Sequence, residues 1–88
     1  MTEIIAEIVE YLNDKAGRRY NPETRQTQKL IIARLNEGFA IEDFKQVIDN
    51  KCKLWNHVPE GGHFDGRKYL RPSTLFGEKF DEYLNEPE

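Results

Sequence analysis

Apolar side chains recur every three or four residues in three successive stretches of this 88-residue chain, and this helical period constrains its fold more than any other feature. The first stretch places six apolar residues on one arc of a helical wheel, opposite four acidic residues. The apolar residues are Ile4, Ile5, Ile8, Val9, Leu12 and Ala16. Gly17 follows where a left-handed C-terminal cap belongs. We therefore predict an amphipathic helix that ends near Ala16.

The same period predicts two further helices. Residues 21–23 read Asn-Pro-Glu, a start signal in which the amide side chain caps free backbone N–H groups and the proline fits the first turn. We predict a second helix from this tripeptide to Gly38, and a third from about Ile41 with Glu42 and Asp43 in its first turn. The residues expected to face inward are Ile31, Ile32, Leu35, Phe44, Val47, Ile48, Leu54 and Trp55.

The rest of the chain is predicted to hold a loop and one short helix. Residues 56–68 contain a proline and three glycines and have almost no apolar period, which predicts a long surface loop. Residues 71–74 then open a short C-terminal helix, whose apolar stripe is Phe76, Phe80, Tyr83 and Leu84. The predicted fold is all-α, a small bundle of three main helices plus a short C-terminal helix. It forms one domain over 1–88, with an ordered core at about 3–85.

Cysteine content and hydropathy bear on the compartment. Cys52 is the single cysteine, which excludes an intramolecular disulfide, and residues 1–10 lack the basic and then apolar layout of a secretory signal. The longest apolar run covers residues 30–33, whereas a membrane span needs about 18 residues. We expect a protein of the bacterial host cytoplasm with no membrane partner.

No set of residues has the spacing that catalysis or metal binding requires. Cys52, His57, His63 and Asp65 are residue types that bind zinc, but they are scattered rather than closely paired. Cys52 also falls on the inner arc of the third helix, where burial makes a thiol inert. The glycines at 61–62 lack the Lys and Ser/Thr of a phosphate-binding loop. We expect no catalytic residue, no metal and no cofactor, so the chain is not predicted to be an enzyme.

The second and third helices invite comparison with a helix-turn-helix motif. A recognition helix contacts DNA through its N-terminal residues, and here these are Glu42 and Asp43, which phosphates repel. An ordinary helical hairpin is the better interpretation.

A binding surface is predicted where basic residues gather. Between positions 15 and 34 six basic residues face one acidic residue, in a chain whose net charge is -3. Arg25 and Lys29 lie one turn apart on the outer face of the second helix, and Arg18 and Arg19 precede it. Such a face suits the phosphates of nucleic acid.

Further residues extend this hypothesis. Arg67, Lys68 and Arg71 join the basic face if the fold brings the far end of the loop near it. Tyr20 and Tyr69 add aromatic rings among the cations, a mixture typical of single-strand binding. The alternative is a solvated surface on which the tyrosines are packing anchors.

Lys51 interrupts the apolar arc of the third helix, between Val47, Ile48 and Trp55. Its methylene groups are expected to cover the core while the ammonium reaches water, a carboxylate or the carbonyls of another helix. The alternative is a partially exposed lysine that binds an anionic partner.

Several segments together form a recognisable pattern. They are Val9–Asn13 with Gly17 and Tyr20, Ala33–Leu35 with Glu37–Phe39, Glu42–Phe44 with Val47–Lys51 and Trp55, and Tyr69–Gly77 with Lys79, Phe80, Tyr83 and Leu84. This pattern resembles the conserved C-terminal domain of phage replication-initiation (replisome organiser) proteins. The most specific element is the run from Tyr69 to Phe76, and the resemblance spans nearly the whole chain.

The resemblance implies a role by similarity to DnaD-type primosomal proteins. The chain would be the C-terminal module of a longer phage or prophage protein, and the pattern carries no active-site roles, although it includes Lys51, Trp55 and Arg71. The implied partners are DNA, single-stranded DNA included, the N-terminal domain of the parent protein, and a replicative helicase or its loader. Two hypotheses stay open: DNA binding through the basic face, or a protein-interaction module that recruits the helicase or loader or that self-associates.

Overall fold

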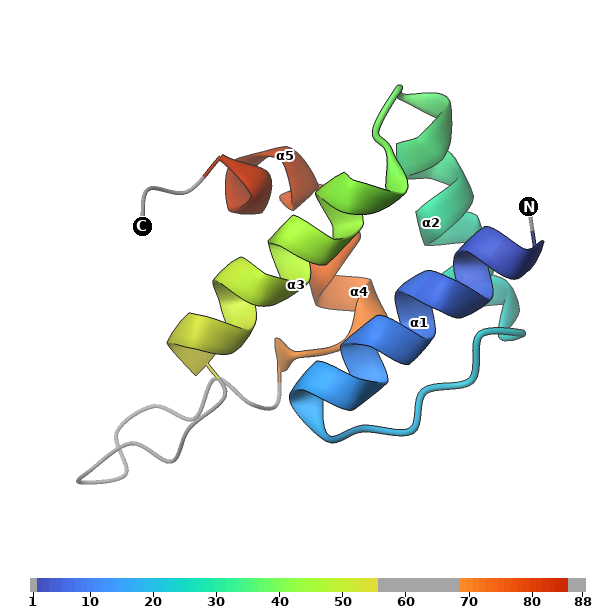
Figure 1. The fold of residues 1–88 in the computed structure, drawn as a ribbon. Helices are drawn as coiled ribbons and strands as arrows, with labels where there is room; N and C mark the ends of the chain where they lie inside the picture. The colour runs from blue at the N-terminus through green and yellow to red at the C-terminus, as the bar shows by residue number, and fades with distance from the viewer. Residues whose placement is uncertain (1, 56–68, 86–88) are drawn as a thin grey trace.

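The computed structural model describes residues 2–55 and 69–85, and every regular element in these ranges is a helix (Figure 1). The helices are α1 (Thr2–Ala16), α2 (Arg25–Asn36), α3 (Ile41–Trp55), α4 (Pro72–Leu75) and α5 (Phe80–Leu84). The all-α prediction is therefore confirmed. The predicted loop at 56–68 lies outside the described residues, as do the side chains of Leu54 and Trp55.

Two glycines end α1 and α2, as the sequence predicts. Gly17 has φ +66° and Gly38 has φ +103°, in the left-handed region where residues with a Cβ are strained. Behind Gly17, the N–H of Arg18 donates to the carbonyl of Asn13 at 3.0 Å. Both glycines thus act as C-terminal caps that reverse the chain.

The start of α2 differs from the prediction. The helix begins at Arg25, and the Asn-Pro-Glu tripeptide at 21–23 forms a turn in front of it. The Asn21 side-chain oxygen accepts a 2.8 Å hydrogen bond from the N–H of Glu23, and the Asn21 carbonyl accepts one of 2.6 Å from the Thr24 hydroxyl. Asn21 therefore caps a turn rather than the helix, because Asn favours turns as readily as helix N-termini.

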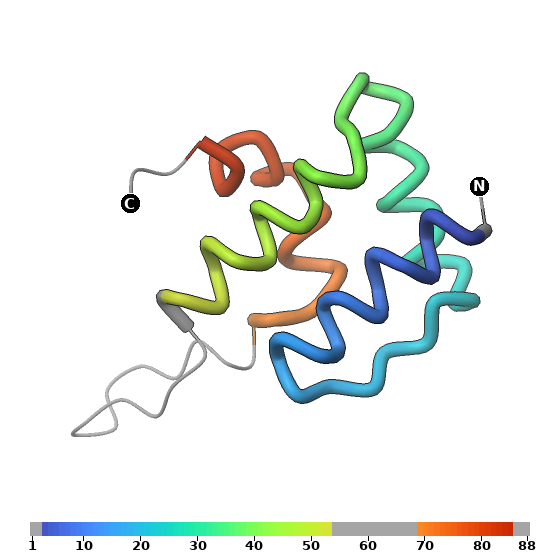
Figure 2. Tube along the Cα trace, viewed as in Figure 1, coloured from blue at the N-terminus to red at the C-terminus, as the bar shows by residue number. Residues whose placement is uncertain are grey.

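Helices α1 and α3 lie side by side and run in the same direction. Lys45 Nζ lies 2.8 Å from Glu7 Oε2, and one helical turn further along the Tyr11 hydroxyl donates to Asp49 at 2.7 Å. Both pairs are 38 residues apart, and a constant offset requires parallel helices. Figure 2 shows that the segment after α1 runs back toward the N-terminal side and that α2 then leads to the start of α3.

The C-terminal residues complete the core. Where the sequence predicts one short helix, the structure has two, α4 and α5, separated by a turn at residues 76–79. A Cβ built on Gly77 would lie 2.9 Å from the carbonyl oxygen of Ser73, so this tight turn requires glycine.

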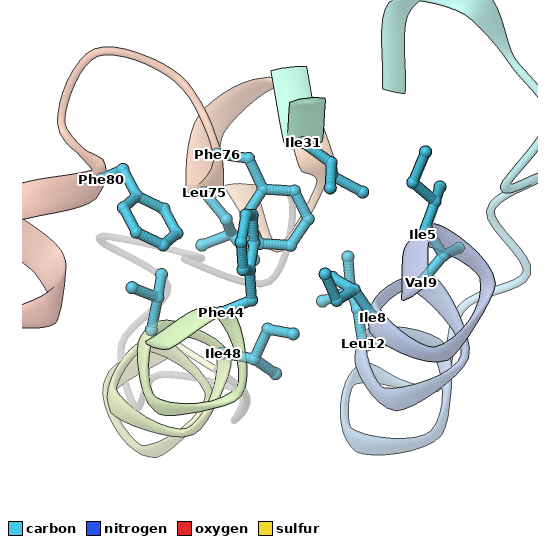
Figure 3. Close-up of a cluster of buried hydrophobic side chains, with 11 residues drawn as sticks. Ile5, Ile8, Val9, Leu12, Ile31, Phe44, Ile48, Leu75, Phe76 and Phe80 are labelled. Carbon is cyan, nitrogen blue, oxygen red and sulfur yellow. The ribbon is translucent and has the colours of Figure 1, made fainter. Parts of the chain in front are cut away.

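The ring of Phe76 from this turn and that of Phe80 from α5 lie in the core cluster (Figure 3). The ring of Phe44 on α3 lies with its centroid 5.3 Å from that of Phe76 and 4.9 Å from that of Phe80. All three residues are buried, and the surrounding core comes from every helix. The other members of this cluster are Ile5, Ile8, Val9, Leu12, Ile31, Val47, Ile48 and Leu75. Helix α4 also contacts α2, and the groove described below lies beside this contact.

Candidate nucleic-acid interface

Four of the predicted basic residues are exposed, two in the segment between α1 and α2 and two in the first turns of α2. Arg18 and Arg19 lie in the connecting segment, Arg25 is the first residue of α2, and Lys29 follows one turn later. We call these four residues the basic surface. Their exposure leaves the cationic groups accessible to an anionic partner.

The connecting segment is held in place by a pair of hydrogen bonds. The Asn13 side-chain amide donates to the Tyr20 carbonyl at 3.0 Å, and the Tyr20 N–H donates to the Asn13 side-chain oxygen at 2.8 Å. The Tyr20 hydroxyl donates in turn to the Leu70 carbonyl at 3.0 Å. Tyr20 is thus a packing anchor, which is the alternative considered for it from the sequence, and the backbone that carries Arg18 and Arg19 is fixed.

Arg25 and Lys29 border a shallow hollow of about 540 Å³ on the outer face of α2. The remaining lining residues are Gln28, Ile32, Ala33 and Asn36. The two cations therefore flank a surface that is partly apolar, and they face the same direction.

Arg34 is not part of the basic surface, although it contributes to the positive charge of this stretch. Its Nη1 donates a 2.7 Å hydrogen bond to the carbonyl of Gly77, and its Nε lies 3.0 Å from Glu37 Oε1. Its side chain is 16% exposed. Arg34 therefore joins α2 to the turn between α4 and α5, which is a structural role.

Arg71 lies apart from the hollow on α2, at the N-terminus of α4. It is exposed, and its Nε donates to the Thr74 hydroxyl at 3.2 Å. The other two basic residues predicted from this region, Arg67 and Lys68, lie outside the described residues.

A second concave surface, which we call the α4 groove, has a volume of about 720 Å³. Its lining residues are Leu30, Tyr69, Arg71, Ser73, Thr74, Gly77, Glu78, Lys79 and Tyr83. Arg71 and Tyr69 are predicted from the sequence to belong to a binding surface, whereas Lys79 and Tyr83 are not. Lys79 is surrounded by acidic residues in the sequence, so it does not form part of a basic cluster there. Tyr83 falls on the apolar stripe of the C-terminal residues, where a core position is expected.

The family model of the conserved phage C-terminus (Phg_2220_C) matches residues 8–85. The chain belongs to this family. No curated protein and no solved structure matches it. The predicted phage affiliation is therefore confirmed. The segment shared with the conserved phage C-terminus family includes the basic surface, the α4 groove and all of α2 to α5.

Lys51 is buried in this phage C-terminal domain. The residue is only 5% exposed, and its Nζ lies 4.4 Å from the centroid of the Tyr83 ring. The partially exposed lysine of the binding hypothesis is therefore not observed. The ammonium lies against an aromatic face, a partner that sequence reasoning did not include.

The cysteine of the phage domain does not resemble a reactive thiol. Cys52 is half-buried, and burial raises the pKa of its thiol, with the nearby Asp49 carboxylate raising it further and Lys15 lowering it. A raised pKa leaves little thiolate at neutral pH. In the ranges 2–55 and 69–85, no group of three or more His, Cys, Asp or Glu residues could hold a metal ion, and His57, His63 and Asp65 lie outside these ranges.

Among the described residues, no helix is long and apolar enough to cross a membrane.

Proposed function

We propose that this domain is a non-catalytic module of a phage DNA replication initiation protein and that it binds DNA through the basic surface. The observation that carries the proposal is the exposure of Arg18 and Arg19 on a segment fixed by hydrogen bonds, together with the exposure of Arg25 and Lys29 on α2. Membership of a phage C-terminal family and the resemblance to replisome organisers support the replication context.

Charge distribution supports binding to phosphates rather than to bases. The basic residues lie on a protein of net charge -3, so the attraction is local to this surface. The first turn of α3 carries Glu42 and Asp43, which argues against its insertion into a major groove. Contacts made by arginine and lysine to phosphates carry no sequence information. Binding is therefore expected to depend weakly on sequence and strongly on salt.

The test is fluorescence anisotropy with a labelled single strand of about twelve nucleotides, a length within the site sizes of single-strand binders. If the four cations each neutralise one phosphate, the logarithm of the affinity should fall with the logarithm of salt with a slope of about -2.8. Doubling the salt concentration should then weaken binding about 7-fold. An affinity that is absent at low ionic strength, or that survives rising salt, contradicts the proposal.

A matched pair of lysine variants locates the interface. Lys29→Ala removes a cation of the basic surface and should make the salt slope shallower by about 0.7. Lys53→Ala removes another exposed lysine, on α3, where it lines a different hollow with Lys15 and Cys52, and should leave the slope unchanged. Equal effects of the two substitutions would mean that binding follows overall charge and not this surface.

A further inference from the structure

The α4 groove combines aromatic rings with cations. Tyr69 and Tyr83 line it together with Arg71 and Lys79, and its volume of about 720 Å³ falls within the range of roughly 300–1,000 Å³ found for small-ligand sites. Aromatic faces stack on unpaired bases of any sequence, and neighbouring cations neutralise the adjoining phosphates. The lining therefore has the chemistry of a site for an unpaired nucleotide.

The residues of the groove are held in position before any ligand binds. The Asn50 side-chain amide donates to the Tyr83 carbonyl at 2.9 Å, which fixes the backbone of Tyr83. Arg71 is oriented by its hydrogen bond to Thr74. Since less side-chain freedom is lost on binding, such preorganisation favours affinity.

The groove adjoins the basic surface through α2. Leu30 lines the groove, and the preceding residue, Lys29, belongs to the basic surface. Successive helical residues differ by about 1.5 Å in rise and point in different directions, so α2 forms a ridge between the two surfaces. A single strand that crosses this ridge would have Lys29 on one side of α2 and the groove on the other.

An unpaired nucleotide fits this groove better than an acidic peptide does. An acidic peptide offers carboxylates to Arg71 and Lys79 but no planar base to Tyr69 and Tyr83, whereas a nucleotide offers both a phosphate and a base face. The carboxylate of Glu78, which also lines the groove, can accept a hydrogen bond from the ring N3–H of an unpaired thymine. A duplex offers no free base faces, because its bases are stacked inside the helix.

We infer that the α4 groove binds one unpaired nucleotide of a single DNA strand, with the base against Tyr69 and Tyr83 and a phosphate near Arg71 and Lys79. This inference rests on the proposed function, which requires only the basic surface. It adds a contact to the base and hence a preference for single strands.

The experiment compares two labelled strands of equal length, an oligothymidine and a strand whose sugars carry no bases. Both have the same phosphate charges, so only contacts to bases distinguish them. Stacking is worth about 1–3 kcal/mol per base, so the full chain should bind the oligothymidine about 5- to 150-fold more tightly than the abasic strand. Tyr69→Leu and Tyr83→Leu should each reduce this ratio and leave the abasic affinity unchanged, with circular dichroism to confirm that each variant folds.

A matched pair of charge variants tests the phosphate contact. Lys79→Ala should weaken binding of both strands, whereas Lys53→Ala, on a different surface, should weaken neither. Equal affinity of the wild-type chain for the two strands overturns the inference and leaves the proposed function intact. A ratio that neither tyrosine substitution changes also overturns it. A wild-type chain that binds neither strand overturns both.

Discussion

The hydroxyl of Tyr11 on α1 donates a 2.7 Å hydrogen bond to the carboxylate of Asp49 on α3. This bond, together with burial and the negative charge of Asp49, raises the pKa of Tyr11 from 10.0 to about 12. The link that sets the register of the two parallel helices is therefore also sensitive to alkaline pH.

Alkaline unfolding should report the loss of this bond. The unfolded chain releases the Tyr11 proton near pH 10 and the folded chain near pH 12, so the folded state holds more protons between these values. The stabilisation is therefore complete below about pH 10 and is lost as the pH rises to about 12. Urea unfolding of the wild type between pH 9 and pH 12 should show a falling free energy of unfolding, and Tyr11→Phe should lack this component of the fall.

At neutral pH, Tyr11→Phe should lower the free energy of unfolding by about 1–2 kcal/mol. This is at the low end of the contribution of a hydrogen bond to a charged group, because both side chains are only partly buried. Glu10→Gln, on the exposed face of the same helix, is the control. It should change neither the free energy of unfolding at neutral pH nor its fall at alkaline pH. Identical alkaline profiles for the wild type and Tyr11→Phe would contradict the assignment.

Arg34 is expected to matter more for stability than its ion-pair partner Glu37. Arg34 uses separate guanidinium nitrogens for the Gly77 carbonyl and for Glu37, and a lysine ammonium cannot make both contacts at once. Arg34→Lys should therefore lower the free energy of unfolding by about 1–2 kcal/mol. Glu37→Gln breaks only a surface ion pair, whose carboxylate side chain is 53% exposed, and should cost less than about 1 kcal/mol. Thermal melts measure both, and a larger loss from Glu37→Gln would show that the Gly77 contact is unimportant.

Phe44 should be among the most sensitive positions of the domain. Phe44→Ala removes a fully buried ring that packs against Phe76 and Phe80, and should cost about 3–5 kcal/mol. The free energy of unfolding of a whole domain is only about 5–15 kcal/mol, so this variant is expected to be largely unfolded at moderate temperature. Ile4→Ala truncates an apolar side chain that is 38% exposed and should have a small effect on the melting temperature.

Lys51 is expected to be dispensable for DNA binding. Because its ammonium is buried against Tyr83, Lys51→Met should change the free energy of unfolding by less than about 2 kcal/mol in either direction. The same variant should bind the oligothymidine as the wild type does, whereas Lys29→Ala should bind it more weakly. A clear loss of DNA affinity in a folded Lys51→Met protein would place Lys51 in the interface.

Local signals in the sequence predict the helices well. The apolar period locates α1 and α3, and Gly17 and Gly38 mark two helix ends, since each of these features depends only on neighbouring residues. The start of α2 is misplaced because Asn21 can cap a turn as well as a helix. The break between α4 and α5 depends on the approach of Gly77 to the Ser73 carbonyl, which no apolar pattern records.

Long-range relationships are beyond sequence reasoning. The pairing of Tyr11 with Asp49 depends on the parallel arrangement of two distant helices. The same holds for Lys51, whose partner Tyr83 lies in another helix. For the candidate site, the exposure of Arg25 and Lys29 follows from the helical wheel. The placement of Arg71 beside Lys79 in a separate groove requires the packing of α4 against α2.

The central position of Phe76 and Phe80 affects the order in which the protein can fold during synthesis. When the ribosome has released only α1 to α3, their inner faces have no aromatic layer to pack against. The nascent chain must therefore expose this apolar surface until Phe80 has passed through the exit tunnel. The hydrophobic core is therefore complete only after α5 has been released, and apolar surface exposed before then is prone to aggregation or chaperone capture.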